Sequence, residues 1–368
     1  MWRRGWKEKK SSRFFGRLLI KISSPMATLF RVDGSGEIGM GHIVRSSALA
    51  EGLKETGEKL IFVTRRYDGK AAEFLNRRGW TTEVLESRLS LREDWKATLE
   101  GIARNQADTV VTDSYDIDES YLRVLKKSGV FLVTLDDQVK LNFPSDLIIN
   151  QNLGFTEEQY RKTEAAQLLL GPKFAILRNE FRMKRSVPRP LVSRPQQILV
   201  TFGGGEEGGL SGKVVRALLA MKEDFKITVV LGPAHSRKTD LKNLEKQEGG
   251  RVEVKENVQE MAELMHRSDL AVCAGGTTCW ELACLGVPAL IFILADNQKK
   301  NSEELDRLGC AVHLGPAESF EEKKLQTHLA GLLHRPEKIK AMSGRNQALV
   351  DGLGVQRIVK VLKGARQL

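Results

Sequence analysis

The sequence predicts an α/β protein of two domains, each built on a doubly wound parallel sheet, that face each other across a cleft. Short apolar runs alternate with amphipathic stretches, which is the pattern of parallel strands joined by helical crossovers. This alternation stops at residues 184–196 and then begins again. The length of 368 residues also favours two domains over one.

The first domain is expected over residues 26–183. A helix is expected from Ile43 to Thr56, because Val44, Ala48 and Leu53 fall close to one face. Six apolar runs are the candidate strands of this domain, and they lie at 28–33, 59–64, 81–85, 108–114, 130–137 and 146–151.

Residues 184–196 are the expected linker, since this segment holds three prolines and four basic residues. The second domain is expected over residues 197–368. Its candidate strands lie at 197–204, 226–232, 251–258, 269–276 and 287–294. Ligands of open parallel sheets bind at the carboxyl ends of the strands, so the loops after these runs are the candidate site.

The formal net charge is +11, and residues 1–25 contribute +7 of it. A mildly basic remainder gives little reason to expect nucleic acid, so none is expected as a partner. The head lacks a long apolar core and an A-x-A site, unlike a secretion signal. We predict that it is disordered or an upstream mis-start before Met26. Its apolar face beside basic residues is the one feature that indicates weak contact with a membrane surface, without stable insertion.

The four cysteines form no C-x-x-C pair and lie beside no spaced histidine pair. Neither a disulfide framework nor a metal site is therefore expected, and a reducing cytoplasm fits this usage. No apolar run reaches the roughly 18 residues that a membrane-spanning helix needs. We expect a cytoplasmic monomer without a cofactor.

The loop after the first expected strand contains Gly36, Gly39 and Gly41 and leads directly into a helix. Glycines let the backbone approach a ligand, and the free N–H groups of a helix start attract an anion. A dinucleotide-binding loop needs an acid about 20 residues further on, where this chain has Arg65 and Arg66. Binding of NADP through these arginines is the less favoured alternative.

His42 ends this loop at the expected start of the helix. The positive end of the helix dipole disfavours the imidazolium ion, so the ring should stay neutral and able to accept a proton. His42 is therefore the candidate general base. The alternative is a ring that caps the helix or packs beneath the loop.

The second domain carries two glycine sites. Gly204 and Gly205 follow its first expected strand, and a stronger candidate diphosphate cradle opens a later helix, with glycines followed by hydroxyls. Glu281 lies one turn into that helix, where its carboxylate is placed to accept both hydroxyls of a ribose. Asn297 and Gln298 begin the next helix and either bind a sugar or cap the helix. The cradle consists of Gly275, Gly276, Thr277 and Thr278.

Taken in order, these motifs resemble the nucleotide-sugar hydrolases of pseudaminic acid biosynthesis. That family removes UDP from UDP-2,4-diacetamido-2,4,6-trideoxy-β-L-altropyranose. The resemblance extends from about residue 27 to the end and implies a GT-B fold of two Rossmann-like domains. Its motifs are D-G-S-G-E-I-G-M-G-H-I-V-R (33–45), T-D-S-Y (112–115), G-P-K-F-A-I-L-R-N-E-F (171–181), T-F-G-G-G (201–205), G-G-T-T-x-W-E (275–281) and D-N-Q (296–298).

The resemblance implies a metal-free reaction in which His42 activates water for inverting attack on the anomeric carbon. Tyr115 and Asn297 take the other catalytic positions, while Arg45 and Asp113 are expected among the substrate-binding residues. The sequence departs from the family after Gly205, where glutamates replace the usual serine or aspartate.

Two rival functions remain at this point. The first is an inverting glycosyltransferase of the same fold, which passes the sugar of a UDP-sugar to a lipid or glycan acceptor. The second is a nucleotide-sugar binding subunit without catalysis, in which His42 only packs.

Overall fold

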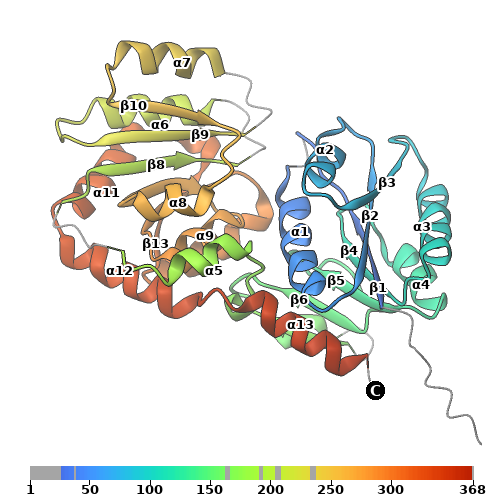
Figure 1. The fold of residues 1–368 in the computed structure, drawn as a ribbon. Helices are drawn as coiled ribbons and strands as arrows, with labels where there is room; N and C mark the ends of the chain where they lie inside the picture. The colour runs from blue at the N-terminus through green and yellow to red at the C-terminus, as the bar shows by residue number, and fades with distance from the viewer. Residues whose placement is uncertain are drawn as a thin grey trace, which may run out of the picture.

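The computed structural model describes residues 26–36, 39–161, 166–189, 194–203, 209–232 and 238–366. They form two domains, each a parallel sheet covered by helices (Figure 1). Every strand pair in both sheets is parallel, with a helix or loop crossing over between strands. The predicted α/β architecture is confirmed.

The first sheet has seven strands in the order β3-β2-β1-β4-β5-β6-β7. The direction of winding reverses between β1 and β4, so the loops after these two strands meet at a switch point where ligands of such sheets bind. The strands are β1 (Ala27–Val32), β2 (Lys59–Arg65), β3 (Thr81–Leu85), β4 (Thr109–Asp113), β5 (Phe131–Leu135), β6 (Leu147–Asn150) and β7 (Gln167–Leu170). The helices are α1 (Gly41–Lys54), α2 (Lys70–Arg77), α3 (Leu91–Asn105) and α4 (Glu119–Lys127).

The second sheet has six strands in the order β10-β9-β8-β11-β12-β13, with its own switch point between β8 and β11. Its strands are β8 (Gln197–Thr201), β9 (Lys226–Leu231), β10 (Val252–Glu256), β11 (Leu270–Ala274), β12 (Ala289–Ile293) and β13 (Ala311–Pro316). The helices from the junction onward are α5 (Asn179–Arg185), α6 (Leu210–Leu219), α7 (Lys238–Gln247), α8 (Met261–Arg267), α9 (Thr278–Leu285), α10 (Lys299–Arg307), α11 (Glu322–Leu333), α12 (Pro336–Leu349) and α13 (Gly354–Ala365). Short 3-10 turns complete the elements at η1 (Glu157–Tyr160), η2 (Pro172–Phe174), η3 (Asp296–Gln298) and η4 (Ala317–Ser319).

All eleven predicted strands are present, and two further strands were missed. β7 is a four-residue edge strand, too short to stand out as an apolar run. β13 contains His313 and Gly315, which interrupt its apolar pattern, and its pairing with β12 shifts register beside Phe292. Both strands lie at the edge of a sheet, where the backbone groups along one side of the strand have no neighbouring strand to bond. Fewer of their side chains must therefore be apolar.

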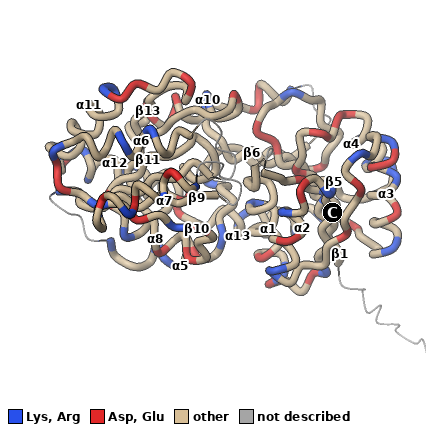
Figure 2. Tube along the Cα trace, turned by 90° about the horizontal axis from the view of Figure 1, so that it is seen from above, with Lys and Arg blue, Asp and Glu red and all other residues tan. Residues whose placement is uncertain are grey.

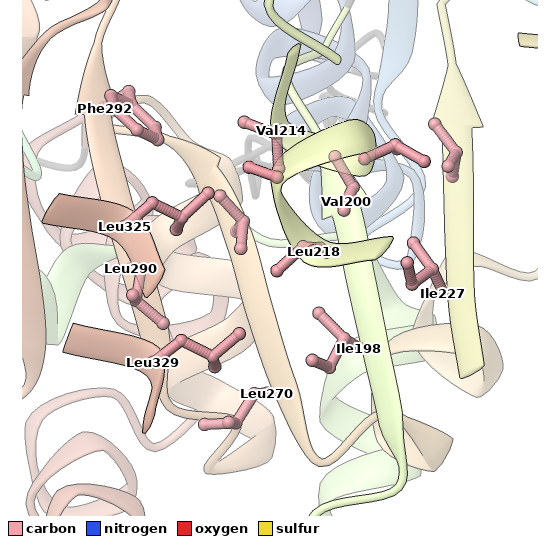
Figure 3. Packing of buried hydrophobic residues seen from close by; sticks show 14 of the residues in the cluster. Ile198, Val200, Val214, Leu218, Ile227, Leu270, Leu290, Phe292, Leu325 and Leu329 are labelled. Carbon is pink, nitrogen blue, oxygen red and sulfur yellow. The ribbon is translucent and has the colours of Figure 1, made fainter. Parts of the chain in front are cut away.

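The second domain has one apolar core between its sheet and the helices α6 and α11 and another between the sheet and the helices α8 and α9. Figure 3 shows Ile198 and Val200 of β8 packed against Val214 and Leu218 of α6, and all four are at most 1% exposed. Each such side chain stabilises the fold by roughly 1.5–3 kcal/mol relative to an exposed one.

The last helix does not belong to the domain that precedes it. α13 leaves the second domain and packs beneath the first (Figure 1), where Ile358 and Leu362 join the core that contains α1. Gly52 permits this close crossing, because a Cβ there would lie 2.3 Å from a methyl carbon of Val355. The expected second domain, 197–368, therefore differs from the structure at its end, since the apolar face of α13 is buried against α1 and η2 of the first domain.

Basic and acidic residues are interspersed over both domains (Figure 2). The basic head, residues 1–25, lies outside the described residues. The expectation that it is disordered or a mis-start, and that it contacts a membrane surface, therefore stays a prediction. In the described part of the chain, no helix is long and apolar enough to cross a membrane.

Candidate active site

The glycine loop after β1 places His42 at the start of α1. Gly39 has a φ of 88°, a conformation that side chains rarely adopt, and its N–H donates to the Ser35 carbonyl at 2.9 Å. This turn brings the chain back so that α1 begins at Gly41. The ring of His42 therefore stands at a helix N-terminus, as the sequence predicts.

Asp113, the last residue of β4, lies directly beneath His42. Its Oδ1 is 2.5 Å from Nδ1 of His42, and Asp113 is only 1% exposed. Burial raises the pKa of Asp113, but the charge of Arg45 and the contact with His42 outweigh burial and hold that pKa well below its usual range. An ionised carboxylate accepts a hydrogen bond from Nδ1–H, which leaves Nε2 as the acceptor nitrogen of the ring.

Arg45 binds the same carboxylate from the next turn of α1. Its Nε and Nη2 donate to the two oxygens of Asp113 at 2.7 and 2.5 Å, and its Nη1 lies 3.4 Å from Asp137. Both Arg45 and Asp113 were expected to bind substrate. The Asp113 carboxylate is buried and accepts from Arg45, His42 and Ser46, and its expected contact with substrate stays a prediction. These contacts orient the His42 ring.

Tyr115 stands beside His42, with the ring centroids 4.6 Å apart and the planes nearly perpendicular. Its hydroxyl donates to Oδ2 of Asp137 at 2.8 Å and accepts from Nδ2 of Asn297 at 2.8 Å. Loss of solvent and the Asp137 carboxylate both raise the pKa of Tyr115 above its ordinary value. The phenol therefore stays protonated and acts as a donor.

Asn297 reaches this cluster from the other domain, within η3 after β12. The structure thus brings the three predicted catalytic residues, His42, Tyr115 and Asn297, into one cluster, while their catalytic roles stay predictions. Gln298, the next residue, accepts from the Leu294 N–H at 3.0 Å and lines the same cleft.

The residues of the expected diphosphate cradle lie in the second domain, and their role stays a prediction. Gly275, Gly276, Thr277 and Thr278 all line the cleft at the start of α9. A Cβ at Gly275 would lie 2.2 Å from Oγ of Ser302, so only glycine fits. The backbone N–H groups of a helix start are suited to stabilise an anion.

Glu281 does not line the cleft. Its Oε1 accepts from Nη2 of Arg178 at 3.1 Å, and Arg178 also pairs with Glu180 at 2.6 Å. Burial raises the pKa of the Glu281 carboxyl, and Arg178 opposes this shift. No pattern in the sequence predicts this partner, which lies 103 residues away, and the expected ribose contact stays a prediction.

The remaining glycines differ in position. Gly39 and Gly41 line the cleft, whereas the Gly36 N–H donates to Oδ2 of Asp68 at 2.7 Å and is therefore already bonded. Gly204 and Gly205 lie outside the described residues.

Together these groups enclose a cleft of about 700 Å³ between the domains. Sequence reasoning missed five of its polar lining residues. Asp137 and Gln151 are the last residues of the predicted runs 130–137 and 146–151 and lie just after β5 and β6, so the rule that sites lie at strand ends was the available signal for both. The five are Asp137, Gln151, Asn152, Lys213 and Glu318.

The described residues contain no group of three or more His, Cys, Asp or Glu placed to hold a metal ion. The four cysteines are buried as free thiols.

The second domain is similar to a known family of domains. Residues 198–358 match the glycosyltransferase family 28 C-terminal domain. Over 90% of its length, the chain is 27% identical to the spore coat polysaccharide biosynthesis protein SpsG of Bacillus subtilis and covers 96% of it. An uncharacterized protein of Methanocaldococcus jannaschii is 29% identical over 77% of the chain, which spans 59% of that protein.

A third relative has two activities in its name. The pseudaminic acid cytidylyltransferase and UDP-2,4-diacetamido-2,4,6-trideoxy-β-L-altropyranose hydrolase of Helicobacter pylori is 26% identical over 64% of this chain. The match spans 43% of that longer protein.

Solved structures agree with the architecture. MurG of Acinetobacter baumannii superposes with a TM-score of 0.65 at 14% identity, over 92% of this chain and 100% of that one. The fold is GT-B. The UDP-GlcNAc 2-epimerase of Neisseria meningitidis, solved with UDP-GlcNAc bound, gives a TM-score of 0.63 at 14% identity, over 92% of this chain and 100% of that one. The GT-B prediction is confirmed.

Proposed function

We propose that this chain hydrolyses a UDP-sugar, with His42 as the general base and water as the acceptor. The observation that carries the proposal is the His42–Asp113 pair at the wall of the interdomain cleft. Asp113 holds the proton on Nδ1, so Nε2 is free to take a proton from water.

The proposed step is a single displacement. Water attacks the anomeric carbon as Nε2 of His42 removes one of its protons, and a new C–OH bond forms with inversion. The C–O bond to UDP breaks, and its electron pair leaves on the diphosphate. Helix N-termini and polar donors on the opposite wall stabilise the charge that develops there.

We further propose that the substrate is UDP-2,4-diacetamido-2,4,6-trideoxy-β-L-altropyranose. The sequence motifs resemble those of the pseudaminic acid hydrolases, and the Helicobacter pylori relative carries that activity in its name. No metal takes part in the proposed step.

An assay without acceptor tests both parts. Purified protein is incubated with this UDP-sugar and, separately, with UDP-GlcNAc, and released UDP and reducing sugar are measured. We expect equal amounts of both products from the first substrate. If the diacetamido sugar stays intact while the protein still binds UDP, the hydrolase proposal is wrong.

The match to the glycosyltransferase family 28 domain favours a second candidate, an inverting transferase with a lipid or glycan acceptor. In that case the enzyme releases little UDP in this assay until an acceptor is added. A subunit that only binds nucleotide sugars would release none with any acceptor.

Lys213 is expected to contribute to diphosphate binding. It lies in the first turn of α6, is exposed and lines the cleft. Arg45, the other Lys or Arg in the lining, is bound to carboxylates. We expect Lys213→Met to weaken UDP binding about fivefold at low salt, as for one exposed charge pair.

Calorimetric titration of UDP at two salt concentrations measures this effect, and the loss should shrink at high salt. Lys226→Met is the matched control, because Lys226 is exposed at the start of β9 and does not line the cleft. Equal affinities of the two variants would contradict this role of Lys213.

A further inference from the structure

Gln151 is a buried amide whose orientation is fixed by the backbone. It follows β6, is 4% exposed, and its Oε1 accepts from the N–H of Ile176 at 2.8 Å. A backbone N–H only donates, so the atom that faces it must be the oxygen. The nitrogen of the amide, Nε2, therefore points the other way.

The Nε2 of Gln151 has two protons to donate and no acceptor among the described residues. This nitrogen is not one of the fully buried polar atoms that lack a hydrogen-bond partner. Since it has no acceptor, part of its surface must be accessible to solvent. Because Gln151 lines the interdomain cleft and is otherwise enclosed, that surface faces the cleft. A buried amide held by one end and open at the other is a preorganised donor.

The position of Gln151 beside the second domain indicates which group of a ligand its Nε2 would meet. Asn301 of α10 accepts from the Leu153 N–H at 3.2 Å and donates to the Gly275 carbonyl at 3.2 Å. Asn301 therefore links the segment that carries Gln151 to the glycine turn before α9. This turn is the proposed diphosphate cradle.

We propose that Gln151 is a substrate-contacting residue whose Nε2 donates to a diphosphate oxygen of the bound nucleotide. The inference rests on the proposed function, because it takes the Gly275 turn as the diphosphate site. It adds a donor from the first domain to a cradle otherwise built by the second. The leaving diphosphate is thus held from both sides of the cleft.

Two substitutions separate this role from a purely structural one. Gln151→Glu keeps an oxygen for the Ile176 N–H but replaces the donor with a charged oxygen in the cleft. Gln151→Met keeps the length and loses both interactions, without adding charge.

We expect Gln151→Met to weaken UDP binding about tenfold, as for the loss of a hydrogen bond to a charged group. Gln151→Glu should weaken it about a hundredfold, because the carboxylate repels the diphosphate as well. The measurement is calorimetric titration of UDP at pH 8, with thermal unfolding to check each fold. Gln326→Glu is the control for added charge, since Gln326 lies on α11 and does not line the cleft.

The order of the two variants decides the outcome. A structural role predicts that Gln151→Glu binds UDP as the wild type does and that only Gln151→Met is impaired, and this result would overturn the proposal. Unchanged affinity in both variants would overturn it as well. Wild-type protein that binds no UDP would instead refute the proposed function, and with it the assignment of Gln151.

Discussion

Replacing His42 with alanine or asparagine is expected to lower turnover of the UDP-sugar by about a hundredfold or more, the usual contribution of a general base. The ring is the group that Asp113 orients, and neither replacement offers a nitrogen able to take a proton. Binding of UDP should be spared, because the cradle before α9 lies on the other domain.

The measurement pairs a steady-state rate with a UDP titration on each variant. His328→Ala serves as the control, since His328 is exposed on α11 and remote from the cleft lining. Near-normal turnover in His42→Ala would remove His42 from the mechanism. A large loss of UDP affinity would assign it to binding instead.

Asp94→Asn is expected to have the largest effect on stability, a loss of about 3–5 kcal/mol in the free energy of unfolding. The carboxylate of Asp94 in α3 is fully buried and accepts from Arg31, from Arg65 at 2.5 Å and from Tyr121 at 2.5 Å. Arg31, which donates to it at 2.6 and 2.9 Å, is itself 0% exposed. The neutral amide leaves two guanidinium groups with too little compensating charge.

Urea unfolding of wild type and variant at pH 7 measures this loss. Glu100→Gln, on the exposed side of the same helix, is the control and should change stability little. A loss below about 1 kcal/mol would mean that the arginines find other partners, Asp33 among them.

The stabilisation by Asp94 should depend on pH. Burial raises its pKa, but the arginines and Tyr121 outweigh burial and lower it to about 2. A depressed pKa contributes stability above the unfolded value of about 3.9, and this contribution is lost as pH falls through the folded value. The difference between wild type and Asp94→Asn should therefore narrow by roughly 2 kcal/mol from pH 5 to pH 2. A constant difference over this range would contradict the assignment.

The sequence predicts best those features that neighbouring residues determine. Apolar runs located eleven strands, and the glycine loop with His42 predicted a histidine at the start of a helix, because both are set by neighbouring residues. The cradle at Gly275 follows from the same kind of pattern.

The rest depends on contacts between distant segments. Asp113 meets His42 across 71 residues, and Asn297 meets Tyr115 across 182. The pairing of Glu281 with Arg178 likewise arises only where α5 passes α9. No spacing rule in one sequence predicts such pairs. The sequence therefore predicts the site residues themselves but not several of the residues that bind them.

The return of α13 to the first domain has a consequence for biosynthesis. Ile358 and Leu362 complete a core whose first strand begins at Ala27, so more than 300 residues separate the two parts along the chain. A ribosome releases the amino-terminal sheet long before this helix emerges from its tunnel. The nascent first domain must then wait with part of its apolar surface uncovered, and it closes only after the second domain has been made.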